Sequence, residues 1–147
     1  MPMLYQVALG SLLMTGTILL AGLTVWVLEV IADKGQAWFV REPQRVKMML
    51  AVMGMSLWSL ATITGGVWLW ATTFYHLQAF PTLEESVYFT LVSFTTLGYG
   101  DVVLPKGLRL LGGMVAVNGM LNIGLLTALL IETIRALRGR QSQRMRR

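Results

Sequence analysis

Charged residues are absent from three long stretches of the chain, and these stretches define its organisation. No Asp, Glu, Lys or Arg occurs in residues 7–28, 48–83 or 110–131. A helix needs about 20 predominantly apolar residues to cross the hydrocarbon core of a bilayer, so each stretch is long enough. The pattern predicts an all-α membrane protein with three transmembrane helices, near residues 5–31, 47–76 and 108–135.

A fourth apolar segment, residues 82–94, is too short to cross a membrane. Thr82 and Glu85 have the spacing of a capping box, which marks the start of a helix. A helix from there to Phe94 would measure roughly 18 Å, against about 30 Å of hydrocarbon. Irregular backbone at membrane depth is tolerated only inside protein or beside a water-filled path. The segment therefore predicts a re-entrant helix that lies beside a pore.

The residues that follow this short helix carry the most specific motif. The string Thr96-Leu97-Gly98-Tyr99-Gly100-Asp101 belongs to residues 95–101, here named the glycine loop. Its glycines allow a backbone that alternates between left- and right-handed conformations. Successive carbonyl groups can then point the same way. The string resembles the signature of potassium channels, in which four copies stack rings of oxygens that replace the water shell of a cation.

Residues 47–135 resemble the pore domain of tetrameric potassium channels in the order of helix, re-entrant helix, glycine loop and helix. Leu97 stands where valine or isoleucine is more usual. The resemblance implies that K⁺ binds at the filter residues Thr96, Leu97, Gly98, Tyr99 and Gly100. The carbonyl oxygens of the first four, with the Thr96 hydroxyl, would form the ion sites.

The same resemblance assigns supporting residues around the filter. Tyr88 and Phe89 match the aromatic pair that buttresses it, together with Thr95, and Tyr88 is placed to hydrogen-bond Asp101. Val92 stands where some bacterial relatives carry a carboxylate that helps to control filter inactivation. We therefore expect that particular coupling to be absent.

In the third long helix, Gly119 matches a hinge glycine, and residues 124–128 closely resemble the inner helix of small two-helix bacterial channels. The match implies a cavity and inner mouth lined by Met120, Ile123, Thr127 and Ile131. At about 100° per residue these four side chains share one face, and Asn118 and Asn122 fall on the opposite face. Because polar groups in membrane helices seek other polar groups, we expect both asparagines to hydrogen-bond neighbouring helices.

The charge distribution predicts how the chain is oriented. The 147 residues carry a formal net charge of +5, and the basic residues gather between the first two helices and after Ile134. By the positive-inside rule, residues 34–46 and the basic tail are cytoplasmic and the N-terminus is outside. We expect contacts with anionic lipid and none with nucleic acid, and localisation in the cell membrane, as in the bacterial inner membrane.

Two further patterns concern helix packing and the outer surface. Gly10, Gly16 and Gly22 are spaced for close helix approach in the first helix. The second helix ends with an aromatic cluster that is typical of a membrane-interface belt. Its members are Trp68, Trp70, Phe74, Tyr75 and His76. His76 has no second ligand in the sequence, so a metal site is not expected.

These observations divide the chain into four parts and predict one main function. The parts are an additional N-terminal transmembrane helix (1–33), a cytoplasmic loop (34–46), a pore domain (47–135, with outer helix 47–76, pore helix 82–94, filter 95–101 and inner helix 108–135) and a basic tail (136–147). We expect a homotetrameric potassium-selective channel that needs no cofactor besides its permeant ion. The alternatives are a non-conducting accessory subunit and a weakly selective cation channel. No nucleophile–base pair, metal cluster or phosphate loop points to an enzyme.

Overall fold

The computed structural model describes residues 2–34 and 44–144, and the regular elements in these residues are all helices. They are α1 (Met3–Lys34), α3 (Gln44–His76), α4 (Leu83–Phe94), the short 3-10 helix η1 (Lys106–Leu108) and α5 (Arg109–Arg144). Three segments are long and apolar enough to cross a membrane: Met3–Thr24, Val52–His76 and Lys106–Glu132. The expected all-α membrane architecture is confirmed.

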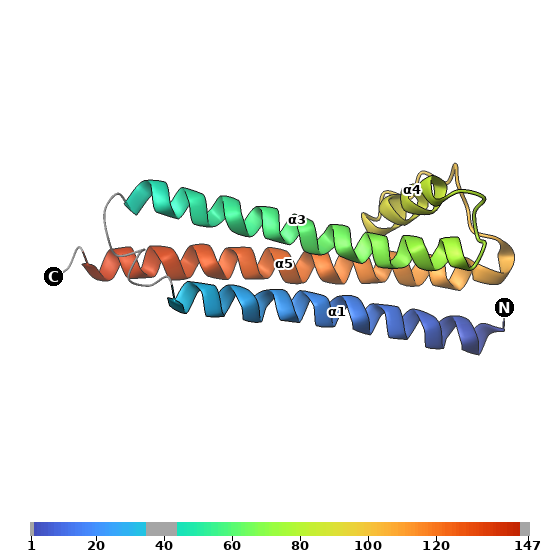
Figure 1. Cartoon of the computed structure of the whole chain (residues 1–147), viewed down its shortest axis with the longest axis horizontal. Coiled ribbons are helices and arrows are strands. Elements are labelled where there is room, and N and C mark those ends of the chain that lie inside the picture. Colours follow the sequence, from blue (N-terminus) through green and yellow to red (C-terminus); the bar gives the residue numbers. More distant parts are fainter. Residues whose placement is uncertain (1, 35–43, 145–147) are drawn as a thin grey trace.

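The three long helices lie side by side, with α5 between α1 and α3 in the view of Figure 1. Helices α1 and α5 run in one direction and α3 runs in the other. The short helix α4 packs against α3 and α5 near one end of the bundle. The N-terminus lies at that same end and the C-terminus at the opposite end, so α1 begins at the end of the bundle that holds the glycine loop, on the other side of α5.

The helix boundaries differ from the expected ones mainly at the C-terminal side. Helix α5 continues to Arg144, although we expected the inner helix to end near residue 135. The added residues include no proline and are mostly good helix formers, so the helix has no local reason to stop. Most of the expected loop, residues 35–43, lies outside the described residues.

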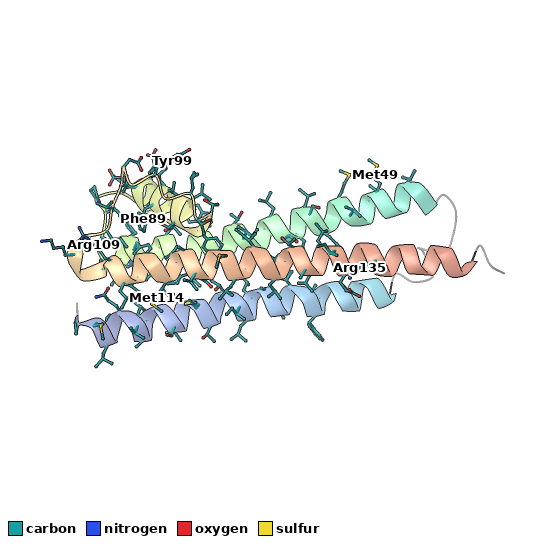
Figure 2. The ribbon with its side chains drawn as sticks, turned by 180° about the vertical axis from the view of Figure 1, so that it is seen from behind. Met49, Phe89, Tyr99, Arg109, Met114 and Arg135 are labelled. Atoms are coloured by element: carbon teal, nitrogen blue, oxygen red, sulfur yellow. The ribbon has the colours of Figure 1, made fainter. Side chains whose placement is uncertain are left out.

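Helix α1 shares its core with the helices of the expected pore domain. Leu13 of α1 belongs to the same cluster of buried side chains as Phe94 of α4 and Val115 of α5. Gly10 explains part of the close packing, because a Cβ atom there would lie 3.2 Å from the Leu111 side chain and would clash with Met114. Figure 2 shows Met114 on the side of α5 that faces α1. Gly22 meets nothing within 4 Å, so the expected role of the glycine spacing is wrong for that residue.

The aromatic residues at the end of α3 divide between the core and the surface. Trp70 and Phe74 are fully buried, with ring centroids 6.0 Å apart. Trp68 and Tyr75 are 47% and 44% exposed. The interpretation of the whole cluster as an interface belt is therefore wrong for Trp70 and Phe74. Residues four apart share a helix face, and that face packs onto the core.

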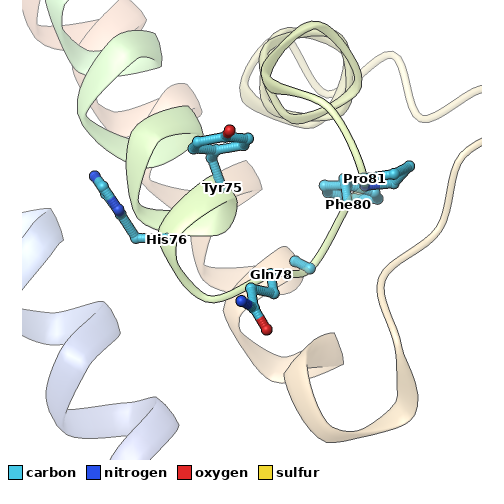
Figure 3. Close-up of a pocket in the computed structure, with 6 residues that line it drawn as sticks. Tyr75, His76, Gln78, Phe80 and Pro81 are labelled. Atoms are coloured by element: carbon cyan, nitrogen blue, oxygen red, sulfur yellow. The ribbon is translucent and has the colours of Figure 1, made fainter.

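Helix α3 ends in a tight turn at Gln78, shown in Figure 3. The amide of Ala79 donates to the Phe74 carbonyl, and the amide of Gln78 donates to the Tyr75 carbonyl, both at 3.0 Å. This is the Schellman pattern, which places the residue after the helix in the left-handed region. Gln78 has φ 52°, as the motif requires. The turn reverses the chain toward α4, and His76 lies exposed beside it.

Candidate functional site

Helix α4 positions the glycine loop. A capping residue fixes where the helix starts, and one face of the helix is buried. Thr82 Oγ1 accepts a hydrogen bond of 3.1 Å from the Glu85 amide, which is half of the expected capping box. Among the described residues, the Glu85 carboxylate makes no return bond to Thr82. Ser86, Thr90 and Phe94 form the buried stripe of the helix, at the four-residue spacing of one face.

The backbone of the glycine loop alternates in handedness as the sequence predicted. The φ angles of Thr96, Gly98 and Gly100 are 59°, 58° and 78°. Leu97 and Tyr99, which lie between them, do not have positive φ. Threonine is normally unfavourable in the left-handed region, so its presence there means that the surrounding bonds impose the conformation.

Those bonds come from the C-terminal carbonyl groups of α4. The amides of Leu97 and Gly98 both donate to the Val92 carbonyl, at 3.0 and 3.2 Å, and the Thr96 amide donates to Ser93 at 2.9 Å. The Thr95 amide donates to the Leu91 carbonyl at 3.0 Å, and its side-chain hydroxyl donates to the same atom at 2.8 Å. The last turn of α4 and the start of the loop therefore form one hydrogen-bonded unit.

The two loop glycines are required by backbone conformation and not by lack of space. A Cβ atom at Gly98 or Gly100 would meet nothing within 4 Å in a single chain. A side chain there would still oppose the positive φ angles.

The glycine loop is exposed in a single chain. Every residue from Thr95 to Asp101 is exposed, including Leu97 at 55% and Tyr99 at 68%. Figure 2 shows Tyr99 at the edge of the molecule, beyond α4. Large apolar and aromatic side chains with this exposure indicate a surface that contacts another protein chain or the membrane.

The aromatic pair of α4 makes two different sets of contacts. The Tyr88 hydroxyl donates a hydrogen bond of 2.6 Å to Asp101 Oδ2, which confirms the expected contact. This bond lowers the pKa of the Asp101 carboxyl below its usual value and raises the pKa of Tyr88. Phe89 turns into the core of its own chain, where its ring lies 5.5 Å from Phe74 and 5.1 Å from Phe80.

The four residues expected to line a cavity lie on one face of α5. Met120 and Ile131 are 62% and 46% exposed, Thr127 is exposed, and Ile123 is half-buried. Gly119 is buried beside the end of α4, where a Cβ atom would lie 2.6 Å from the Phe94 carbonyl carbon and would overlap its oxygen. Sequence reasoning identified Gly119 as a hinge and missed this close contact.

The opposite face of α5 holds a buried cluster that we name the polar junction: Thr17, Asn118 and Asn122. The Thr17 hydroxyl donates to Asn118 Oδ1 at 2.8 Å, and Asn122 Nδ2 donates to the same oxygen at 3.0 Å. Asn118 is 0% exposed and Asn122 is 4% exposed. Asn122 Nδ2 also donates to Thr17 Oγ1 at 3.4 Å, so the expectation that both asparagines hydrogen-bond a neighbouring helix is confirmed. The role of Thr17 was missed, although the buried Gln6, Thr17 and Thr24 mark one helical face of α1.

Comparison with known proteins identifies the family. Residues 62–136, just over half of the chain, match the family model described as an ion channel. Neither the comparison with curated proteins nor the comparison with solved structures found a match. The matched segment contains the end of α3, all of α4, the glycine loop and most of α5. With this match and its three helices of membrane-spanning length, the chain belongs to the ion channel family and is a multi-pass membrane protein.

Proposed function

We propose that this ion channel conducts K⁺ selectively and that the glycine loop is its selectivity filter. The observation that carries the proposal is the alternation of φ at Thr96, Gly98 and Gly100, directly after a short helix inside a membrane protein. Such a backbone can direct consecutive carbonyl oxygens toward one axis. The proposed ion ligands are the carbonyl oxygens of Thr96, Leu97, Gly98 and Tyr99, together with the Thr96 hydroxyl.

The proposed assembly is a homotetramer around a central pore. One loop supplies a quarter of each oxygen ring in the filters of potassium channels, so a single chain cannot surround an ion. The exposure of Leu97, Tyr99 and Met120 supports this assembly, because a single chain leaves the filter and one face of α5 uncovered. In the proposed tetramer, Met120, Ile123, Thr127 and Ile131 line the water-filled cavity below the filter.

The proposed orientation follows from the positions of the basic residues. The α4 end of the bundle faces outward and the C-terminal end of α5 faces the cytoplasm, consistent with Arg135, Arg138, Arg140 and Arg144 on that half of the helix. Basic residues near a membrane surface attract anionic lipids by about 1 kcal/mol each. We therefore include anionic lipid among the proposed partners.

Ion flux from purified protein in liposomes tests the proposed function. Vesicles loaded with K⁺ and diluted into K⁺-free buffer are expected to develop a K⁺-driven membrane potential that drives uptake of a proton or dye reporter. The same vesicles loaded with Na⁺ are expected to show little uptake. Equal uptake from both gradients would identify a weakly selective cation channel. No uptake from either gradient, with tetramers present, would identify a non-conducting subunit.

A further inference from the structure

Thr17 of α1 lies against α5 and close to α3, near the end of α4. Its hydroxyl oxygen lies 2.8 Å from Asn118 Oδ1 of α5 and also 2.8 Å from the Met14 carbonyl oxygen of its own helix. Its methyl group lies toward α3, since a Cβ atom on Gly66 would be 3.7 Å from Thr17 Cγ2, and the same Cβ atom would be 3.3 Å from the Phe94 ring of α4. Thr17 is 1% exposed. A residue of the additional N-terminal helix therefore sits among the elements that carry the glycine loop.

The contacts of Thr17 continue without a gap to the base of the glycine loop. Asn118 precedes Gly119, and the backbone of Gly119 lies directly against the carbonyl group of Phe94. Phe94 is the last residue of α4, and Thr95 begins the loop. A displacement of α5 at Gly119, or of the end of α4, must therefore change the packing around Thr17.

The hydrogen bonds of the polar junction make α1 difficult to detach from α5. Outside water, each unpaired polar group costs free energy, and detachment would expose the Asn118 and Asn122 amides to lipid tails. Asn118 Nδ2 is buried and has no hydrogen-bond partner among the described residues, so the junction already contains one unpaired donor. A second buried contact, between the Thr24 and Thr62 hydroxyls at 3.1 Å, joins α1 to α3.

We propose that α1 is a brace for the ion pathway, and that Thr17 is a positioning residue that holds α5 and the end of α4 in place through the polar junction. The inference rests on the proposed function, because it assigns α1 a role in opening and closing the channel. Thr17 touches neither the ion nor the glycine loop. Its loss is therefore expected to alter gating and to leave the selectivity for K⁺ over Na⁺ and the unitary conductance unchanged.

Three full-chain variants test this role in single-channel recordings. Thr17→Val keeps the shape and removes the hydroxyl, Thr17→Ser keeps the hydroxyl, and Thr15→Val is the matched control. Thr15 is exposed on the same helix, and its hydroxyl donates to the Ser11 carbonyl of α1 at 2.8 Å. Thr17→Val is expected to change the open probability by about threefold or more, from the typical strength of hydrogen bonds between membrane helices. Thr17→Ser and Thr15→Val are expected to match the wild type.

The recordings separate a positioning role from a purely structural one. A structural role would reduce the number of channels and leave the open probability of each unchanged, which would overturn the proposal. Wild-type gating in Thr17→Val, or equal changes in Thr17→Ser and Thr17→Val, would also overturn it. In these cases the wild type still conducts, and the proposed function stands. A wild-type protein that never conducts would contradict both.

A double-mutant cycle tests the contact without reference to ion flux. Thr17→Val and Asn118→Leu are combined, and the unfolding equilibrium of the purified full-length protein is measured in detergent. The two substitutions are expected to be non-additive by about threefold in the equilibrium constant, whereas Thr15→Val and Asn118→Leu are expected to be additive. Additive effects of Thr17→Val and Asn118→Leu would contradict the proposal that Thr17 holds α5 in place through the polar junction.

Discussion

The two faces of α5 differ in how far a single chain covers them. Asn118 and Asn122 are buried against α1, where Thr17 forms a hydrogen bond with each of them. Met120 and Ile131, on the opposite face, are large apolar residues that remain 62% and 46% exposed. The polar face of a membrane helix is thus inside the protein and an apolar face is uncovered.

This contrast identifies what each face requires. Amide groups inside a membrane need hydrogen-bond partners, and α1 supplies one within the same chain. The uncovered face requires either lipid or further copies of the chain. The exposed glycine loop lies at the end of the same bundle, and in the proposed tetramer three further copies of the loop complete the ion site. We therefore associate the face of Met120 with the proposed pore and the face of Asn118 with the support of that pore.

The largest expected effect comes from the glycine loop. Gly98→Ala places a Cβ atom on a left-handed residue, at a cost of roughly 1–2 kcal/mol in each chain, and we expect K⁺ selectivity or conduction to be lost. Gly113→Ala is the control, since Gly113 of α5 is helical and a Cβ atom there would meet nothing within 4 Å. Liposome flux with K⁺ and Na⁺ measures the difference. Wild-type selectivity in Gly98→Ala would show that the filter is elsewhere.

A second prediction concerns which face of α5 meets the ion pathway. The chain contains no cysteine, so an introduced thiol is the only one present. Met120→Cys is expected to react with a water-soluble thiol reagent applied from the cytoplasmic side and to lose most of its current. Val115→Cys, at a fully buried position of the same helix, is expected to keep its current. If modification of Met120→Cys leaves the current unchanged, this face does not line the pore.

The third prediction tests the contact between α5 and the end of α4. Gly119→Ala forces a methyl group against the Phe94 carbonyl, and we expect a destabilisation of about 1–3 kcal/mol from overpacking. Gly124→Ala is matched in chemistry and lies on the same helix, and a Cβ atom there would meet nothing within 4 Å. Chemical unfolding in detergent compares the two. A stable Gly119→Ala variant with altered gating would instead support the hinge role suggested by the sequence resemblance.

The smallest expected effect concerns pH at the outer end of the glycine loop. The Tyr88 hydrogen bond lowers the pKa of Asp101 from its ordinary value of 3.8. The stabilisation from a lowered pKa is present above the ordinary value and is lost as the pH falls through the lowered one. In Tyr88→Phe, the Asp101 pKa is expected to rise toward its ordinary value, so the carboxyl is protonated at a higher pH than in the wild type and this stabilisation is lost.

Titration of the Asp101 carboxyl by NMR in wild-type protein and Tyr88→Phe measures this shift. Tyr75→Phe, which removes an exposed phenolic hydroxyl from α3, is the control. An unchanged Asp101 titration in Tyr88→Phe would mean that the bond does not hold the carboxylate in the membrane-embedded protein.

The sequence predicted those features that depend on local pattern. Charge-free stretches located the long helices, the Thr82 cap located α4, and the glycine spacing predicted the alternating backbone. The positions of Asn118 and Asn122 followed from helical periodicity together with the resemblance of residues 124–128 to known inner helices. These features require no knowledge of which helices pack together.

Features that depend on packing between distant segments were not predicted. Thr17 and Asn118 are 101 residues apart, and the polar face of α1 that contains Thr17 does not indicate which helix it contacts. Trp70 and Phe74 were interpreted by composition alone, although their four-residue spacing distinguished them from Trp68. The contact of Gly119 with Phe94 likewise appears only when α4 is placed on α5.

Reversal potentials of the purified channel in a planar bilayer test whether the glycine loop selects K⁺. With K⁺ on one side, Na⁺ on the other and equal concentrations, we expect a reversal potential far toward the K⁺ equilibrium potential. The Gly98→Ala channel, where it conducts, is predicted to reverse close to zero. A wild-type reversal potential close to zero would contradict the assignment of the glycine loop as a potassium filter.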